Sequence, residues 1–403
     1  MIESKYYKEY NYLNDITYLD VASMGLPPQR TLDHCRGFED VFAKSFGRVS
    51  LEGDYERQRI RVQADVARLL HTDPANIMFT VNTTQGTSLL AKSLNLQPGD
   101  EIISTAIEYP TILLGWGQRQ AEGIRLKLIK TQNGTFSAED ILNEMTERTR
   151  VVHLSFVHNH TGFMPDIEKI GAICRERSIL FAVDAIQALG RVPVDVEKMN
   201  IDYLSTAAFK GLLGVLGSGF VYCCPKLQPM LKPEVYSDYN IVYDEETMTN
   251  MMQIPVLPYR QGLEAIQGGS VSSYGITAMG KSIELLLEIG IDRVYSHCLR
   301  LENLFRKGLS PLEDKVQILG SKDCKHWSGV ICLKFDKDRT KQMKNAFADK
   351  KIYAHIREGY LRISFHYYNC VVYCNVCSRN DCICRQRFCT VSYTHLEPTR
   401  PIS

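Results

Sequence analysis

Between residues 55 and 225 the chain alternates helix-period stretches with short apolar runs, and this alternation most strongly limits the folds available to it. Three amphipathic stretches are expected to form helices: Tyr55–Leu70, Thr84–Leu94 and Asp166–Arg177. Six apolar runs are expected to form strands: Ile77–Thr80, Glu101–Ser104, Arg125–Ile129, Val151–Phe156, Leu180–Val183 and Gly219–Cys223. A repeated βα order of this kind predicts an α/β domain with three layers around a mainly parallel, mixed sheet.

The last third of the chain mixes helix and strand signals. A long helix is expected from near Tyr274 towards Ile289, linking two parts of the chain. The unit from Leu301 to about Asn369 combines one helix with two strands, expected at Asp338–Asp349, Gly329–Phe335 and Tyr360–Ser364. We therefore expect two domains: a large one, residues 15–270, and a small α+β one, residues 1–14 plus 271–369.

Composition indicates a small-molecule partner. The 403 residues carry a formal net charge of +1 and a sequence pI of about 7.5, so they lack the one-sided electrostatic field that nucleic acid or anionic membranes attract. The segment Met1–Asn14 has no apolar core of a secretory signal, and no run approaches the roughly 20 apolar residues of a membrane span. These features predict a cytoplasmic protein that binds neither nucleic acid nor membrane.

The C-terminal tail, residues 370–403, differs in composition from the rest and holds six of the thirteen cysteines. Four of these form two close pairs, Cys374-x-x-Cys377 and Cys382-x-Cys384. Their irregular spacing argues against a structural zinc site, and His158 and His160 have no third ligand nearby in sequence, so we predict no metal. Because Val391–Leu396 resembles the translation of a sequencing-library adapter, we expect the tail to result from a frameshift near residue 370 and not to form a domain.

The pair Asp184 and Lys210 carries the clearest chemical signal. Asp184 ends an expected buried strand, and Lys210 follows 26 residues later in Ala207-Ala208-Phe209-Lys210-Gly211. Pyridoxal phosphate needs both residue types: a lysine forms an imine with its aldehyde, and a carboxylate keeps its pyridine nitrogen protonated so that the ring accepts electrons. A helix-capping aspartate and a surface lysine are the plain alternatives.

Further segments resemble the class V aminotransferase family, which includes the cysteine desulfurases, over almost the whole chain to about Asn369. Tyr18–Pro27 resembles the family's entry segment, and Asn82-Thr83-Thr84-Gln85-Gly86 resembles its phosphate-binding turn. The resemblance implies the pyridoxal-phosphate fold of type I, with Thr84 and then Thr83 as phosphate contacts. Hydroxyls and free amides at a helix N-terminus suit a phosphate, although a simple helix cap by Asn82 or Thr83 is the alternative.

The same resemblance implies the remaining cofactor contacts. Tyr109 occupies the position of the residue that stacks on the pyridine ring, often a histidine in the family, and a core tyrosine is the alternative. Asn159 resembles the asparagine that hydrogen-bonds the cofactor's phenolic oxygen, and Gln187 is expected to share this role. Ser270 resembles the residue that reaches the partner subunit's phosphate, which implies a homodimer.

Two features concern the substrate and the lysine. Arg362, within Tyr360–Asn369, resembles the arginine that binds the substrate α-carboxylate, for which a guanidinium fork is well shaped; an arginine paired with a surface acid is the alternative. Before Lys210 the family usually has a serine and a histidine, whereas this chain has Ala207 and Phe209. We expect Thr206 or Ser205 to substitute for the missing hydroxyl.

These residues predict a pyridoxal-phosphate-dependent enzyme that acts on an amino acid, with Lys210 as the base that moves the α-proton. Transamination, elimination and epimerisation all begin in this way, so the cofactor site does not distinguish them. One alternative is a cysteine desulfurase or selenocysteine lyase, disfavoured because no cysteine lies between Lys350 and Arg362 and because Cys332 sits in an apolar strand. The other is a cofactor-binding protein that has lost catalysis.

Overall fold

The computed structural model describes residues 2–13, 16–45, 53–244, 249, 256–312 and 314–370. Apart from Cys370, the predicted frameshift-derived tail and its cysteine pairs lie outside the described residues. In the described part of the chain no helix is both long and apolar enough to cross a membrane.

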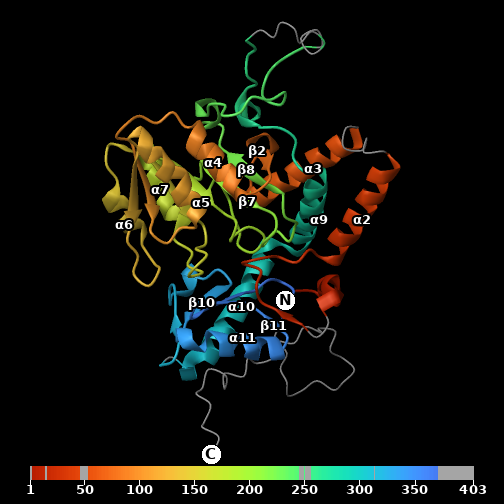
Figure 1. Ribbon diagram of the computed structural model, residues 1–403, viewed down its shortest axis with the longest axis vertical. Helices are drawn as coiled ribbons and strands as arrows, with labels where there is room; N and C mark the ends of the chain where they lie inside the picture. The colour runs from red at the N-terminus through yellow and green to blue at the C-terminus, as the bar shows by residue number, and fades with distance from the viewer. Residues whose placement is uncertain are drawn as a thin grey trace, which may run out of the picture.

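A seven-stranded sheet forms the centre of the larger part of the molecule (Figure 1). Its strands are β2 (Ile77–Thr80), β3 (Glu101–Thr105), β4 (Arg125–Ile129), β5 (Thr149–Ser155), β6 (Leu180–Asp184), β7 (Tyr203–Ala207) and β8 (Gly219–Cys223). Their order is β2-β8-β7-β6-β5-β3-β4, and β8 alone runs in the direction opposite to the other six strands. The predicted mixed, mainly parallel sheet is therefore confirmed, with β7 as a strand that we had not expected.

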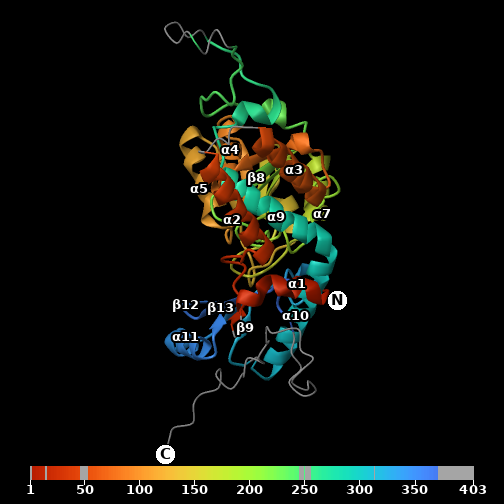
Figure 2. The same cartoon turned by 90° about the vertical axis from the view of Figure 1, so that its right-hand side faces the viewer.

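Helices cover both faces of this sheet because successive strand residues are apolar on opposite sides. The helices are α3 (Gly53–Leu70), α4 (Thr83–Ser93), α5 (Pro110–Gln118), α6 (Ala138–Glu144), α7 (Ile167–Glu176) and α9 (Ser273–Ile289), and α2 (Gln29–Lys44) packs against α9. Ile102 packs in one core with Leu90 of α4, whereas the next residue, Ile103, belongs to a second core with Ile170 of α7 and Met279 of α9. Figure 2 shows α2, α3 and α9 together on one side of the molecule. The architecture is the expected three-layer α/β arrangement.

A second, smaller sheet lies below the first in Figure 1, and α9 and α10 (Ile291–Leu309) run from one part to the other. It is antiparallel, with the order β12-β13-β10-β9, and α11 (Thr340–Asp349) lies beside it. Its strands are β9 (Gln317–Ile318), β10 (Val330–Lys334), β12 (His355–Arg357) and β13 (Tyr360–Ser364). The N-terminal strand β1 (Thr17–Tyr18) pairs in parallel with β11 (Ile352–Tyr353), so the start of the chain joins this part. The boundary near residue 270 stays a prediction.

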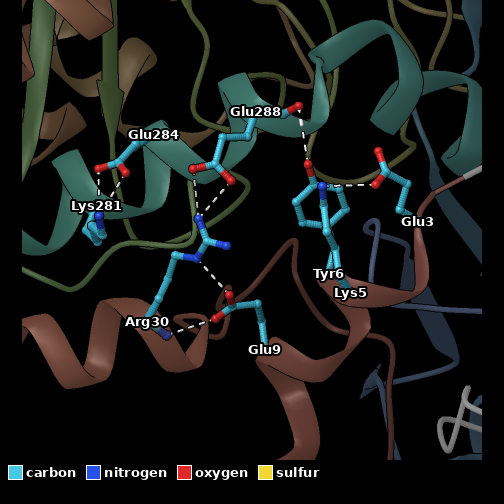
Figure 3. A network of polar contacts seen from close by, with 8 residues as sticks. All are labelled: Glu3, Lys5, Tyr6, Glu9, Arg30, Lys281, Glu284 and Glu288. Atoms are coloured by element: carbon cyan, nitrogen blue, oxygen red, sulfur yellow. Dashed lines mark hydrogen bonds and ion pairs between the residues drawn. The ribbon is translucent and has the colours of Figure 1, made fainter.

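An ion-pair network fixes the N-terminal segment to the helices (Figure 3). Arg30, near the start of α2, contacts Glu9 at 2.7 Å and Glu288, near the end of α9, at 2.9 Å. The Arg30 backbone N–H also donates to Glu9 at 2.8 Å, so this carboxylate satisfies one of the free amides at the helix start. These contacts set the path of the chain just before and after the segment of residues 18–27.

Candidate active site

A cavity of about 280 Å³ opens at the carboxyl ends of the central strands, where ligands bind in open α/β sheets. The lining residues come from the ends of β5 and β6 and from the segments that follow β2, β3, β5, β6 and β7, and the N-termini of α4 and α5 close one end. The lining residues are Val81, Asn82, Thr83, Thr84, Tyr109, Thr111, Ser155, Val157, Asn159, Asp184, Ile186, Gln187, Phe209, Lys210, Leu216 and Gly217. The structure thus brings together seven of the nine predicted site residues, leaving Arg362 beside the cavity and Ser270 apart from it.

Asp184 and Lys210 line the same cavity, as expected. The Asp184 side chain is 3% exposed, and its Oδ1 accepts a hydrogen bond from the Ile186 backbone N–H at 2.9 Å. The Lys210 Nζ lies 5.9 Å from the Tyr109 ring centroid and 5.7 Å from that of Phe209. Burial raises the pKa of the Asp184 carboxyl and lowers the pKa of the Lys210 ammonium, and the attraction between the two opposes both shifts. Because the pKa is lowered, a larger fraction of Lys210 is the neutral, nucleophilic amine at a given pH.

The turn that carries Lys210 rests on the entry segment. The Gly25 N–H donates to the Phe209 carbonyl at 2.7 Å, and a Cβ placed on Gly25 would lie 1.9 Å from the Lys210 carbonyl oxygen. Within the turn the Leu213 N–H donates to that same Lys210 oxygen at 2.9 Å. Only a glycine allows this close approach, which gives a physical reason for the glycine in the entry segment.

The end of the cavity formed by α4 is rich in hydroxyls. Asn82 caps the helix by accepting from the Gln85 N–H at 2.8 Å, while the buried Thr83 Oγ1 has no hydrogen-bond partner among the described residues. The Thr84 Oγ1 lies 3.2 Å from the Oγ1 of Thr111, a residue that sequence reasoning did not single out. A helix N-terminus with an unsatisfied hydroxyl favours an anionic group here.

Ser205 and Thr206 do not fill the role expected of them. Neither lines the cavity: the Ser205 hydroxyl pairs with Thr87 at 3.2 Å, and the Thr206 hydroxyl lies 3.4 Å from the Ala207 carbonyl oxygen. The expectation that one of them replaces the hydroxyl missing at position 207 is wrong in this subunit.

Asn159 connects the cavity to the predicted carboxylate anchor. Its Oδ1 accepts from the Gln187 Nε2 at 3.1 Å and also from the Arg362 guanidinium. Gln187 Nε2 donates in addition to the Ala22 carbonyl at 3.0 Å, and the buried Gln187 Oε1 has no partner among the described residues. The two residues predicted for the cofactor's phenolic oxygen, Asn159 and Gln187, therefore form one hydrogen-bonded chain with the predicted carboxylate anchor Arg362.

Arg362 lies on β13, where it is 8% exposed and held by polar neighbours. It donates to the Ser23 Oγ at 2.5 Å and lies 3.5 Å from the Asp20 carboxylate. Neither neighbour was singled out from the sequence, although both belong to the entry segment that was. A guanidinium held in this way is already oriented for a planar anion.

Ser270 lies apart from the other predicted residues of its own subunit. Its hydroxyl pairs with that of Tyr239 at 2.6 Å, and it is absent from the described lining of the cavity. Ser270 therefore does not contact the cavity of its own subunit. Its expected role in the site of a partner subunit stays a prediction.

No cysteine is among the described residues that line the cavity. Cys332 lies opposite Arg362 in the small sheet, where it is 3% exposed, and burial raises the pKa of its thiol to about 12. Cys324 is exposed and lies in a short 3-10 helix (Cys324–His326) before β10. A thiolate is the reactive form of cysteine, so Cys332 is poorly suited to act as a nucleophile.

The residues of the cavity match four chemical groups of a ligand. The end with the free Thr83 hydroxyl suits an anion, the buried Asp184 suits a protonated ring nitrogen, and Lys210 suits a carbonyl carbon. The exposed face of Tyr109 suits a flat ring between these points. Pyridoxal 5'-phosphate carries all of these groups, so the residues fit this cofactor.

Comparisons with known proteins agree with this assignment. A family model described as "Aminotransferase class-V" matches residues 17–371. The chain is 25% identical over 381 residues to a probable cysteine desulfurase of Methanothermobacter thermautotrophicus, a match that covers 89% of this chain and 92% of that protein. It is also 28% identical over 258 residues to cysteine desulfurase IscS of Neisseria meningitidis, covering 63% of this chain and 58% of that protein.

Solved structures share the fold. The cysteine desulfurase from Thermococcus onnurineus superposes with a TM-score of 0.81 at 22% identity, covering 92% of this chain and 94% of that one. The cystine C–S lyase C-DES, in complex with its product cysteine persulfide, superposes with a TM-score of 0.77 at 19% identity, covering 88% and 94%. Taken together, the named relatives favour the desulfurase-type alternative over transamination or epimerisation.

Proposed function

We propose, from the premise that this chain belongs to the class V aminotransferase family and is a pyridoxal-phosphate-dependent enzyme, that it is a lyase cleaving the Cβ–S bond of a cysteine-derived amino acid. The names of its relatives, cysteine desulfurases and a cystine C–S lyase, support sulfur chemistry on such a substrate. L-Cystine is the substrate that we expect first, and L-cysteine second.

One observation carries the choice of elimination over sulfur transfer to the enzyme. Sulfur transfer needs a reactive cysteine near the substrate, but the stretch between Lys350 and Arg362 contains none, and the buried Cys332 has a raised pKa. Among the described residues, the cavity lining offers no thiol either. Sulfur would therefore leave with its own electron pair, and a disulfide substrate provides the better leaving group, since low-pKa thiols depart more readily.

The protein's residues divide the task among them. Arg362, oriented by Ser23 and Asn159, binds the substrate α-carboxylate. With the cofactor bound, the Lys210 Nζ would be the base that takes the proton from the substrate Cα, and its lowered pKa keeps it available as a base near neutral pH. When bound, pyridoxal phosphate would supply an electron sink for the pair released at Cα, and Asp184 would keep its ring nitrogen protonated.

The reaction balances without an external oxidant or reductant. In cystine the Cα–H bond and the Cβ–S bond break, and the sulfur leaves as cysteine persulfide with the Cβ–S electron pair. Hydrolysis of the remaining three-carbon unit consumes one water and gives pyruvate and ammonia.

We also expect a homodimer in the cytoplasm. One support for the dimer is that Ser270 pairs with Tyr239 and does not line the cavity of its own subunit. A second is the presence of exposed apolar side chains in the same region, among them Tyr236 and Val235. Support for a reducing compartment comes from seven described cysteines that carry free thiols: Cys35, Cys174, Cys223, Cys224, Cys298, Cys324 and Cys332.

Product analysis of the purified protein with added pyridoxal phosphate tests the proposal. Pyruvate and persulfide should form from L-cystine, should vanish in Lys210→Ala, and should persist in the double variant Cys324→Ser/Cys332→Ala. Formation of a keto acid that still carries its sulfur would overturn the lyase reaction. Loss of sulfur release in the double variant, with cofactor binding intact, would indicate transfer to an enzyme cysteine instead.

A further inference from the structure

The phosphate end of the cofactor site lacks two side-chain hydrogen-bond donors in this chain, at positions 207 and 209. A phosphate dianion presents several strong acceptor oxygens, each of which needs a donor when water is excluded. Ala207 and Phe209, just before the lysine, contribute no side-chain donor, and the hydroxyls of Ser205 and Thr206 bond elsewhere. Some other part of the chain must supply the missing donor.

Two helix N-termini, rather than one, meet at this end of the cavity. α4 begins at Thr83 and α5 at Pro110, and the two helices pack through a shared core that includes Leu90 and Ile112. Their approach is close, since a Cβ on Gly115 of α5 would lie 3.7 Å from the Ala91 Cβ of α4. The first amides of each helix lack partners within the helix, so both ends are positive.

The side chains at these two ends are in direct contact. The Thr84 Oγ1 and Thr111 Oγ1 lie 3.2 Å apart, and both residues line the cavity. Thr83 lines it as well, and its buried hydroxyl has no partner among the described residues. Two hydroxyls this close can donate to neighbouring oxygens of one phosphate by rotating away from each other.

We propose that Thr111, at the N-terminus of α5, is a phosphate ligand that joins Thr83 and Thr84 in a clamp made by two helix ends. The clamp replaces the donors that positions 207 and 209 do not provide. The inference depends on the cofactor and not on the lyase reaction, so either can fail without the other.

Comparing two ligands isolates the phosphate contribution. The apparent Kd of pyridoxal phosphate, measured from its visible absorption on binding, is compared with that of pyridoxal, which lacks the phosphate. Thr111→Val should weaken pyridoxal phosphate binding about ten- to hundredfold, because a hydrogen bond to a charged group is lost, and should change pyridoxal binding less than about twofold. Thr111→Ser, which keeps the hydroxyl, should bind pyridoxal phosphate nearly as the unmodified chain does.

A matched control variant and a double-mutant cycle at Thr84 and Thr111 complete the test. Thr135→Val removes a threonine hydroxyl that bonds the Gln132 carbonyl outside the cavity, and it should leave both Kd values unchanged. The changes in pyridoxal phosphate binding free energy caused by Thr84→Val and by Thr111→Val should not add up to that of the double variant, since the two hydroxyls are in contact. Equal weakening of both ligands by Thr111→Val, or no weakening of either, would overturn the proposal, provided that the apo-protein melts as the unmodified chain does.

Discussion

Replacing Gly25 by alanine should damage the site from a position that touches no substrate. The new methyl group would lie 1.9 Å from the Lys210 carbonyl oxygen and 2.8 Å from its carbonyl carbon. Since non-bonded carbon and oxygen need about 3.3 Å, the segment and the lysine turn must separate by about 1.4 Å. That shift also stretches the hydrogen bond from the Gly25 N–H to Phe209. Overpacking of this kind costs about 1–3 kcal/mol of folding stability, whereas a 1 Å misplacement of a reacting group costs about a hundredfold in rate.

The assay separates these two effects. Urea unfolding should show the modest loss of stability, and kcat/KM for the amino-acid substrate should fall about a hundredfold in folded protein. Gly37→Ala is the matched control: it lies in α2, where an added Cβ meets nothing within 4 Å, and it should stabilise the protein by about 0.5–1 kcal/mol. A Gly25→Ala protein with unchanged kcat/KM and stability would refute the reasoning that the entry segment positions the lysine.

Three further changes test separate parts of the structure. Arg362→Lys keeps the charge but loses the fork, so KM for the amino acid should rise about tenfold or more while kcat changes less; equal changes in both would contradict a binding role. The rate at which the apo-protein takes up pyridoxal phosphate should rise with pH through a midpoint well below the ordinary lysine value of 10.5, because neutral Lys210 is the nucleophile and burial lowers its pKa. In Asp184→Asn that midpoint should move lower still, since the lost carboxylate raised the lysine pKa, and an upward shift would oppose this account. Arg30→Met should lower the free energy of unfolding by about 1 kcal/mol at low salt, and by less in 1 M salt, where ion pairs are screened.

Much of the fold follows from local pattern, and the exceptions have physical reasons. The observed bounds of β2, β4, β8 and β13 are those expected from short apolar runs. β7 was missed because its Ser205 and Thr206 read as a polar loop, whereas both hydroxyls find partners and are buried. The Ser205 partner, Thr87, lies 118 residues away in the sequence, so this contact comes from tertiary packing and leaves no local signal.

The site divides in the same way. Lys210 and Asp184 were predictable because each ends or follows a strand at the edge where ligands bind. Ser23 lies 339 residues from its partner Arg362, and no spacing rule connects them. Thr111 was overlooked since its role depends on how closely α4 and α5 pack, which sequence periodicity does not specify.

The entry segment links the two halves of the reaction. The Ala22 N–H donates to Ser364 on β13 at 2.8 Å, Ser23 accepts from the substrate anchor Arg362, and Gly25 contacts the lysine turn. These contacts lie within four consecutive residues, so a displacement of the backbone there moves the carboxylate anchor and the base relative to each other. Changes in this segment should therefore alter KM and kcat together, whereas changes at the phosphate end alter cofactor affinity alone. This difference in kinetic signature distinguishes residues that align the substrate with the base from those that only retain the cofactor.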